Sequence, residues 1–295
     1  MDQKRLIILS IIGTGITSVT TQLLTIREFL TQFHGNEITI SLSLFCWLLL
    51  TGIGSLAAKI VRRSSLQFYS LLILLIAVWP LLQLIAVRGL REAFFSHGVS
   101  LGFYPMFFYI LTAITPYCLL TGFILPFAQK VLNDCHYPFE SGHLYLTDNI
   151  GDITGGVLFS FVLVFWVNPF STIAITSSLL ILVAFLLLRR SRGYTLLVTA
   201  FVVISLFYYY ATNSRFERST LAAQYGNIIK YLESPYGRIV VSREGSQHTF
   251  WESGTPLYSG SNIIKSEEKV HYSLCQLDRV ESVLLVSGGL GETMT

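Results

Sequence analysis

The chain has 295 residues, of which 52% are apolar and only 13% are charged. The charged share is about half of that in an ordinary soluble domain, which argues against a wholly soluble protein. The formal net charge of +3 is small and spread along the chain, so a nucleic-acid-binding role has no support. The apolar residues dominate up to residue 212 and polar residues follow, which predicts a membrane domain and then a soluble region.

Apolar stretches long enough to cross a bilayer fill the first part of the chain. A helix needs about 20 apolar residues for a crossing, and the first stretch lacks the small-residue cleavage site of a signal peptide. We therefore expect a polytopic, mainly α-helical membrane domain over residues 1–212. Its seven predicted crossings are residues 6–26, 38–58, 66–87, 103–127, 144–167, 170–188 and 194–212.

The lysine and arginine residues predict the orientation of these crossings. With the N-terminus inside, nine of them lie in inner segments and five in outer segments near the membrane, which favours a cytoplasmic N-terminus. Seven crossings would then place the soluble tail outside the cytoplasm. Alternatively one stretch does not cross, and 144–167 is the weakest because it contains Asp148, Asn149 and Asp152. The sequence leaves both alternatives open.

Polar residues in or beside the spans are candidate functional residues, because burying them in lipid is costly. Asp148 and Asp152 are four residues apart and share a helix face. Arg27, Glu28 and Glu37 flank the loop between the first two spans. These residues could form an intramembrane ion or proton site or a polar cavity. Alternatively, the two aspartates lie near the headgroups and Arg27 pairs with a nearby glutamate.

Small residues and cysteines give weaker signals. Gly151 and Gly155, like Gly54 and Ala58, have the spacing that favours close packing of membrane helices. No pair among the four cysteines has metal-ligand spacing, so neither a metal site nor a disulfide framework is expected.

The polar region over residues 213–282 has strand-like alternation followed by a helical segment. Turn residues separate the apolar runs, which predicts an antiparallel meander. The helix is expected at Glu267–Leu277, with Ser266 as its cap. The predicted strands are residues 228–232, 237–242 and 248–251.

A glycine-rich segment follows a last apolar strand at Val283 to Ser287. Gly288, Gly289 and Gly291 would let the backbone approach a ligand closely, and a following helix would present free N–H groups to it. The pattern is typical of the start of a Rossmann-like, methyltransferase-type cofactor domain, here residues 283–295.

Taken together, these segments resemble the spermidine synthase-like (polyamine aminopropyltransferase) family, and specifically its membrane-fused bacterial branch. The similar stretches in the soluble region are 225–241, 252–258, 267–274 and 283–291, and those in the membrane region are 22–30, 35–37 and 145–151. The resemblance implies a protein of the bacterial inner membrane that transfers an aminopropyl group from decarboxylated S-adenosylmethionine to a polyamine or other small amine.

The chain departs from the family pattern at three ligand-contacting positions. Gly226 stands where the family often has a glutamine, Leu290 where it has an acid in the glycine loop, and Lys265 where it has a tyrosine. The family's catalytic and ribose-binding acids lie beyond the glycine loop, so no catalytic residue is assigned in this chain.

Two functions therefore stand as expectations, and a third possibility is a purely structural anchor that organises partners through packed helices and binds no ligand. The first is the N-terminal part of a membrane-bound spermidine synthase-like protein, a fragment that is inactive alone and binds no cofactor, whose longer parent binds the S-adenosyl-type nucleoside. The second is a small-molecule or polyamine transporter, or a membrane binding module, with a regulatory soluble tail. Asp148, Asp152, Arg27 and Glu28 would then form its polar site.

Overall fold

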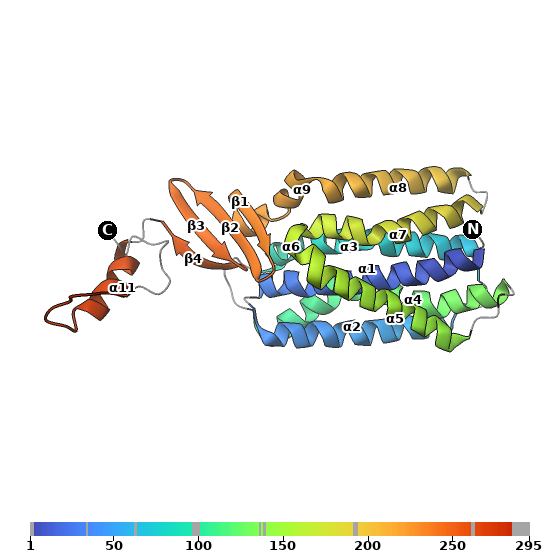
Figure 1. The fold of residues 1–295 in the computed structure, drawn as a ribbon, viewed down its shortest axis with the longest axis horizontal. Coiled ribbons are helices and arrows are strands. Elements are labelled where there is room, and N and C mark those ends of the chain that lie inside the picture. Colours follow the sequence, from blue (N-terminus) through green and yellow to red (C-terminus); the bar gives the residue numbers. More distant parts are fainter. Residues whose placement is uncertain are drawn as a thin grey trace. The chain divides into compact units, whose positions relative to one another are not determined.

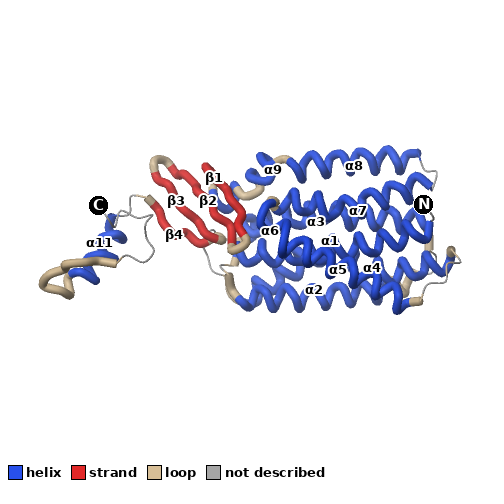
Figure 2. Tube along the Cα trace, viewed as in Figure 1, coloured by secondary structure: helices blue, strands red, loops and turns tan. Residues whose placement is uncertain are grey.

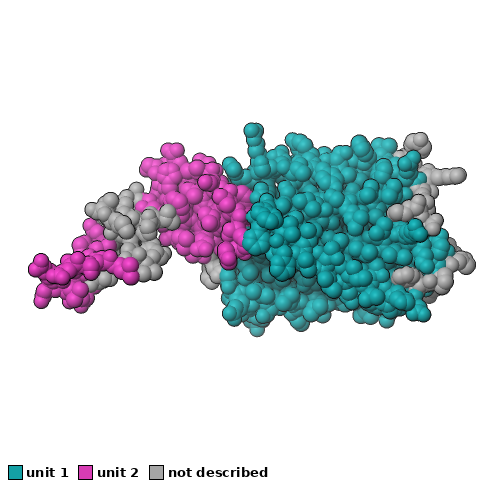
Figure 3. Space-filling model, viewed as in Figure 1, with its two compact units in different colours: residues 1–224 teal, residues 225–295 magenta. Residues whose placement is uncertain are grey.

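The chain is described by a computed structural model that divides into two compact units, residues 1–224 and 225–295 (Figure 3). Polar residues 213–224 belong to the first unit, together with the helices that precede them. The structure describes residues 3–33, 35–61, 64–95, 101–135, 137, 140–190, 194–260 and 263–284.

The first unit is a bundle of long helices that run side by side (Figure 1). Among the described residues, six helical segments are long and apolar enough to cross a membrane, and α8 provides a further, shorter apolar stretch at Leu196–Thr212. The chain is therefore an integral membrane protein by length and composition. Its helices are α1 (Gln3–Gln32), α2 (Glu37–Ala57), α3 (Leu66–Phe94), α4 (Phe103–Asp134), α5 (Ser141–Leu158), the π-helical turn η1 (Phe159–Leu163), α6 (Val164–Trp166), α7 (Pro169–Arg190), α8 (Tyr194–Thr212), α9 (Ser214–Ser219) and α10 (Ala222–Tyr225).

Helix α1 extends six residues beyond the predicted span, which ends at residue 26. The prediction stopped where charged residues begin. The helix continues because Glu28 and Gln32 are buried against α3, where Glu28 meets Arg88 and Gln32 donates to the Val87 carbonyl. Tertiary partners thus replace the water that these polar side chains would otherwise need.

Two pairs of helices approach each other closely through glycine. On α5, Gly151 and Gly155 lie against the backbone carbonyls of Ile12 and Ile16 of α1. Gly54 of α2 and Gly122 of α4 likewise lie against the backbone of the opposite helix. The sequence predicted close packing at Gly151, Gly155 and Gly54, and the backbone contacts confirm it.

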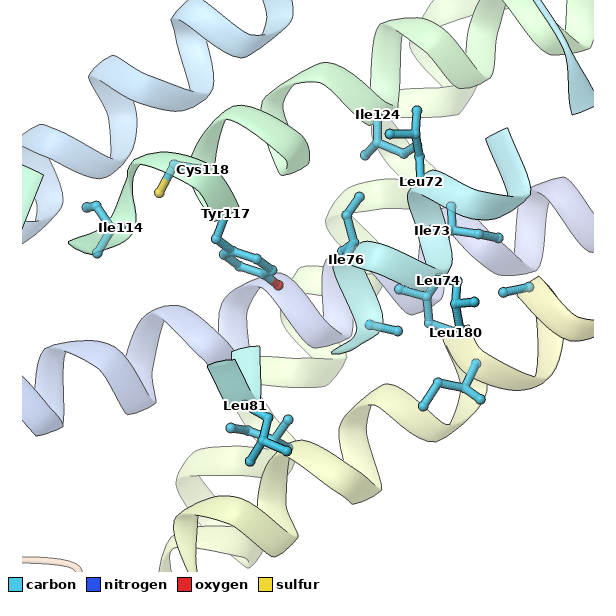
Figure 4. Packing of buried hydrophobic residues seen from close by; sticks show 14 of the residues in the cluster. Leu72, Ile73, Leu74, Ile76, Leu81, Ile114, Tyr117, Cys118, Ile124 and Leu180 are labelled. Carbon is cyan, nitrogen blue, oxygen red and sulfur yellow. The ribbon is translucent and has the colours of Figure 1, made fainter. Parts of the chain in front are cut away.

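The apolar core of the first unit lies between α3, α4 and α7, with α1 alongside (Figure 4). Ile73 and Ile76 of α3 and Ile114 of α4 are fully buried, as is Leu180 of α7. The Tyr117 hydroxyl is directed from α4 toward α1, where it donates to Thr21 Oγ1 at 3.4 Å. Polar contacts of α1 are therefore set into an otherwise apolar interior.

The second unit contains a four-stranded antiparallel sheet in the order β1-β2-β3-β4 (Figure 2). Gly245 and Gly254 adopt positive φ in the tight turns between strands, as the predicted meander requires. The strands are β1 (Asn227–Ser234), β2 (Gly237–Glu244), β3 (Gln247–Glu252) and β4 (Thr255–Ser259).

Helix α11 spans Ile263–Leu274 and therefore begins earlier than expected. The prediction that Ser266 caps it is wrong, because Ser266 lies inside the helix, and no glycine or proline stands between Ile263 and Ser266 to prevent the earlier start.

The cofactor strand falls only partly within the described residues. Val283 and Leu284 have no regular secondary structure, and they are 64% and 88% exposed. The remainder of that strand and the predicted loop of Gly288, Gly289 and Gly291 lie outside the described residues, as does Leu290.

Candidate functional site

A buried ion pair between α1 and α3 is the strongest electrostatic feature of the membrane unit. Arg88 donates to Glu28 Oε2 from Nη2 at 2.9 Å and from Nε at 3.1 Å. The two side chains are only 1% and 2% exposed. Both charges are thus withdrawn from solvent, and their mutual hydrogen bonds offset the cost of desolvation.

The same arginine reaches the short segment that follows α8. Its Nη1 donates to Thr220 Oγ1 at 2.9 Å, and its Nη2 lies 3.9 Å from Glu217 Oε1 of α9. The guanidinium also stands over the Phe170 ring of α7, 4.9 Å from the centroid. Arg88 therefore joins α1, α3, α7 and α9 at one end of the bundle. Hereafter, the Arg88 cluster means Arg88, Glu28, Glu217 and Thr220.

Sequence reasoning identified Glu28 but assigned no site role to Arg88 or Glu217. It counted Arg88 among outer loop charges, because this arginine follows the apolar stretch that ends at residue 87. The position of a charged residue directly after an apolar stretch was the only local signal in the sequence for a role of Arg88. Nothing in one sequence indicates that the last turns of α3 fold back onto Glu28, 60 positions away.

The other candidates near the first loop are not gathered into this cluster. Arg27 is half-buried in α1, and Glu37 is exposed in the first turn of α2. A carboxylate there complements the positive end of the helix dipole, and Asn36 caps the same turn by accepting from the Ile38 N–H. Glu37 therefore has a sufficient structural role as a helix-start residue.

Asp148 and Asp152 lie within a span, beside the middle of α1. The Asp148 carbonyl and the Asp152 N–H approach Gly15, which is about 18 Å along the helix from Gln3. Both side chains are half-buried. The two aspartates therefore lie against α1 within the apolar segment Ser141–Trp166.

Asp148 borders a small cavity that also carries hydroxyl groups. Thr14 and Tyr69 line it together with apolar side chains of α1 and α4, and the Tyr69 hydroxyl lies 2.6 Å from Ser10 Oγ. Carboxylate and hydroxyl oxygens suit a cation or a protonated amine. The cavity has no room for a water molecule, so binding would require α1, α4 and α5 to separate.

A metal ion would need several metal-ligating side chains close together. Among the described residues, no group of three or more histidine, cysteine or acidic side chains could hold one. An ammonium ligand needs only hydrogen-bond acceptors and negative charge, which the aspartates and neighbouring hydroxyls supply.

Further polar contacts follow the buried side of α1 between these two places. Thr17 donates to the Thr176 carbonyl of α7 at 3.2 Å, and Gln83 of α3 donates to Thr25 Oγ1 at 2.8 Å. The hydroxyls also bond to carbonyls of α1 itself, as Thr21 does to Thr17. These bonds hold α1 in a fixed rotation, which positions both Glu28 and the face that meets Asp148.

In the soluble unit, a second buried arginine stabilises the sheet. Arg238 of β2 donates from Nε to Glu233 Oε1 of β1 at 2.6 Å, and the Tyr231 hydroxyl donates to the same oxygen. Trp251 donates to Ser242 Oγ at 2.8 Å on the neighbouring strand pair. These side-chain contacts connect β1 with β2 and β2 with β3.

Gly226 has a structural requirement for glycine. It connects α10 to β1 with a φ of +70°, a conformation that side chains other than glycine adopt with strain. The glutamine that the resemblance implies at this position would be disfavoured here. Lys265 lies in α11, among residues whose side chains the structure does not describe.

No family model, no curated protein and no solved structure matches the chain.

Proposed function

We propose that the chain is the N-terminal part of a membrane-bound spermidine synthase-like protein. The observation that carries this proposal is the order of elements in the soluble unit. The stretch 225–241 contains β1, its turn and part of β2, and 252–258 includes most of β4. The stretch 267–274 lies within α11. The resemblance implies the same succession of strands, turn and helix before the cofactor domain.

In this proposal the membrane unit is an anchor and the cofactor site belongs to the longer parent protein. The parent binds decarboxylated S-adenosylmethionine or a similar nucleoside through the loop of Gly288, Gly289 and Gly291. Chemistry requires an acid that holds the amine and a base that frees its lone pair. The resemblance implies that the family's catalytic acids lie beyond the glycine loop, so we expect residues 1–295 alone to transfer no aminopropyl group.

Nucleoside binding tests the proposal. The protein is expressed from a reading frame extended past Thr295, and residues 1–295 are prepared in the same lipid nanodiscs. Calorimetry with decarboxylated S-adenosylmethionine should detect binding to the extended protein and none to residues 1–295. An extended, folded protein that binds no S-adenosyl nucleoside would rule the proposal out.

A second candidate function is supported by the position of Asp148 and Asp152 within a span. We propose, as the alternative, that the membrane unit binds or transports small amines, with these carboxylates and the Thr14 and Tyr69 hydroxyls as its polar groups. Ionisable residues inside a membrane span are commonly part of a substrate path.

Amine flux into proteoliposomes tests this alternative. Radiolabelled putrescine should enter vesicles that contain the wild-type chain, and Asp148→Asn should abolish the uptake because it removes the carboxylate charge. Glu37→Gln is the matched control, since Glu37 is exposed at a helix start. Equal uptake by Asp148→Asn and wild type, or no uptake above empty vesicles, would reject the transport role.

A further inference from the structure

The starting point of α8 is fixed by the direction of α7. Helix α7 runs antiparallel to α1, because Leu180 packs against Gly13 while the Thr176 carbonyl accepts from Thr17. The C-terminal end of α7 therefore lies at the end of the bundle where α1 begins. Helix α8 starts at Tyr194, shortly after α7 ends.

The far end of α8 is fixed by the Arg88 cluster. Glu217 and Thr220, which follow α8 closely, are held by Arg88 beside Glu28. Phe216 also packs on Tyr210 of α8, with ring centroids 4.7 Å apart. Glu28 lies near the C-terminal end of α1, so α8 ends at the side of the bundle opposite to Gln3.

The distance between these ends matches a bilayer. Helix α8 has 19 residues, which gives a length of about 28 Å at about 1.5 Å per residue. The hydrocarbon core of a bilayer is about 30 Å thick. The α8 sequence contains no charged residue, whereas a helix that lies on the membrane surface needs a strongly polar face.

From these constraints we infer that α8 is a seventh membrane crossing and that the soluble unit and the N-terminus face opposite sides of the membrane. The inference goes beyond the proposed function and does not rest on it. The end of the helix bundle that contains the Arg88 cluster then lies at the level of the lipid headgroups on one side of the bilayer.

Exposed aromatic side chains at this end of the bundle are consistent with a position among the lipid headgroups. They come from the ends of four helices that meet at the Arg88 side, and aromatic rings concentrate at membrane–water interfaces. Their position at the end of α8 agrees with a complete crossing by this helix. These exposed aromatic residues are Phe94 of α3, Phe103 and Tyr104 of α4, Phe165 and Trp166 of α6, and Tyr209 and Tyr210 of α8.

Thiol labelling in sealed vesicles tests the inference, and the chain offers a natural reporter in the soluble unit. Cys275 is exposed, while Cys46 and Cys118 are buried. The first protein keeps Cys275 and carries Cys135→Ser. The second carries Lys59→Cys with Cys135→Ser and Cys275→Ser, which places a thiol in the exposed turn just after α2, on the Gln3 side.

A membrane-impermeant maleimide is applied to right-side-out and inside-out vesicles. The two thiols should be labelled from opposite sides, each in one vesicle type only. Labelling of both thiols from the same side would overturn the inference. Only variants that elute and melt like the wild-type protein are scored.

A third protein examines α8 directly. Ser205→Cys, made with Cys135→Ser and Cys275→Ser, puts a thiol in the middle of α8, where Ser205 is exposed on the bundle surface. It should react with the maleimide only after the membrane is dissolved in denaturing detergent. Reaction in intact vesicles of either type would place α8 on the membrane surface and contradict the seventh crossing.

The experiment also shows whether Cys275 lies on the cytoplasmic or on the external side of the membrane. Cytoplasmic Cys275 would satisfy the requirement of the spermidine synthase-like proposal for a nucleoside made in the cytoplasm, and external Cys275 would count against it. In both cases the opposite location of Lys59→Cys supports the seventh crossing, so failure of one proposal is distinguishable from failure of the other.

Discussion

Arg88 connects the helices at the end of the bundle opposite to Gln3. Its charge is buried, and it bonds to groups on α1 and on the segment after α8. Removing one partner of a buried ion pair leaves the other charge without compensation in a medium of low polarity. The cost of losing Arg88 should therefore far exceed that of losing an exposed arginine.

We predict that Arg88→Ala lowers the free energy of unfolding by about 3–5 kcal/mol, the usual cost of breaking a buried pair. Arg218→Ala is the matched control, because Arg218 is exposed in nearby α9 and should change stability by less than about 0.5 kcal/mol. Denaturant titration of the purified proteins in detergent measures both. Equal losses from the two substitutions would contradict the assigned role of Arg88.

A double substitution distinguishes the cost of an unpaired buried charge from the loss of the other contacts of Arg88. Glu28→Gln combined with Arg88→Met removes both charges while roughly keeping their volume, so we expect it to recover a large part of the stability that Arg88→Ala loses. The same titration detects the recovery. A double variant less stable than Arg88→Ala would indicate that Arg88 stabilises the bundle mainly through Thr220 and Glu217.

At the scale of elements, close helix pairs are specified by glycines. A Cβ atom at Gly151 would overlap the Ile12 carbonyl, and the backbone cannot yield as a flexible side chain can. At Gly156 the same atom would meet only Val19 Cγ1 at 3.7 Å, which is ordinary contact. The contact between α1 and α5 should therefore be disturbed by a side chain at Gly151 but should accept one at Gly156, five residues away.

Gly151→Ala should consequently destabilise the membrane unit by about 1–3 kcal/mol, the usual cost of overpacking, whereas Gly156→Ala should have little effect. Thermal unfolding in one detergent gives the comparison. Indistinguishable melting temperatures for the two variants would show that α1 and α5 are not packed through Gly151.

The elements were predictable where composition alone decides them. Apolar stretches located the long helices, and turn residues located β1, β2 and β3, because hydrocarbon and tight turns each restrict the residues they accept. The ends were predicted less well. Helix α1 continues through Glu28 because Arg88 neutralises it, and α11 begins before Ser266. Tertiary contacts and local helix continuation outweighed the boundary signals there.

The candidate site was predictable only in part for the same reason. The spacing of Asp148 and Asp152 predicted that they share a helix face, but it did not predict their contact with Gly15, on a helix more than 130 residues earlier. Arg88 and Glu217 were not predicted as partners of Glu28, since pairing between distant segments leaves no local pattern in one sequence.

At the scale of the whole molecule, the chain combines a membrane bundle with a small sheet unit. Described basic residues at the Gln3 side, including Lys59, Lys130 and Arg189, favour a cytoplasmic N-terminus. Arg88, on the opposite side, is neutralised by Glu28 and contributes little to this bias. If α8 is a seventh crossing, a cytoplasmic N-terminus would put the residues that follow α8 outside the cytoplasm, and this outcome would count against the spermidine synthase-like proposal.

The central proposal about chemistry is that this chain is the N-terminal part of a spermidine synthase-like protein and has no transferase activity by itself. The most direct measurement incubates residues 1–295 in nanodiscs with putrescine and decarboxylated S-adenosylmethionine and quantifies spermidine by mass spectrometry. The account predicts no product above protein-free nanodiscs, because Gly226, Lys265 and Leu290 stand where the resemblance implies ligand-contacting side chains of another kind. Spermidine that increases in proportion to the amount of protein would contradict it.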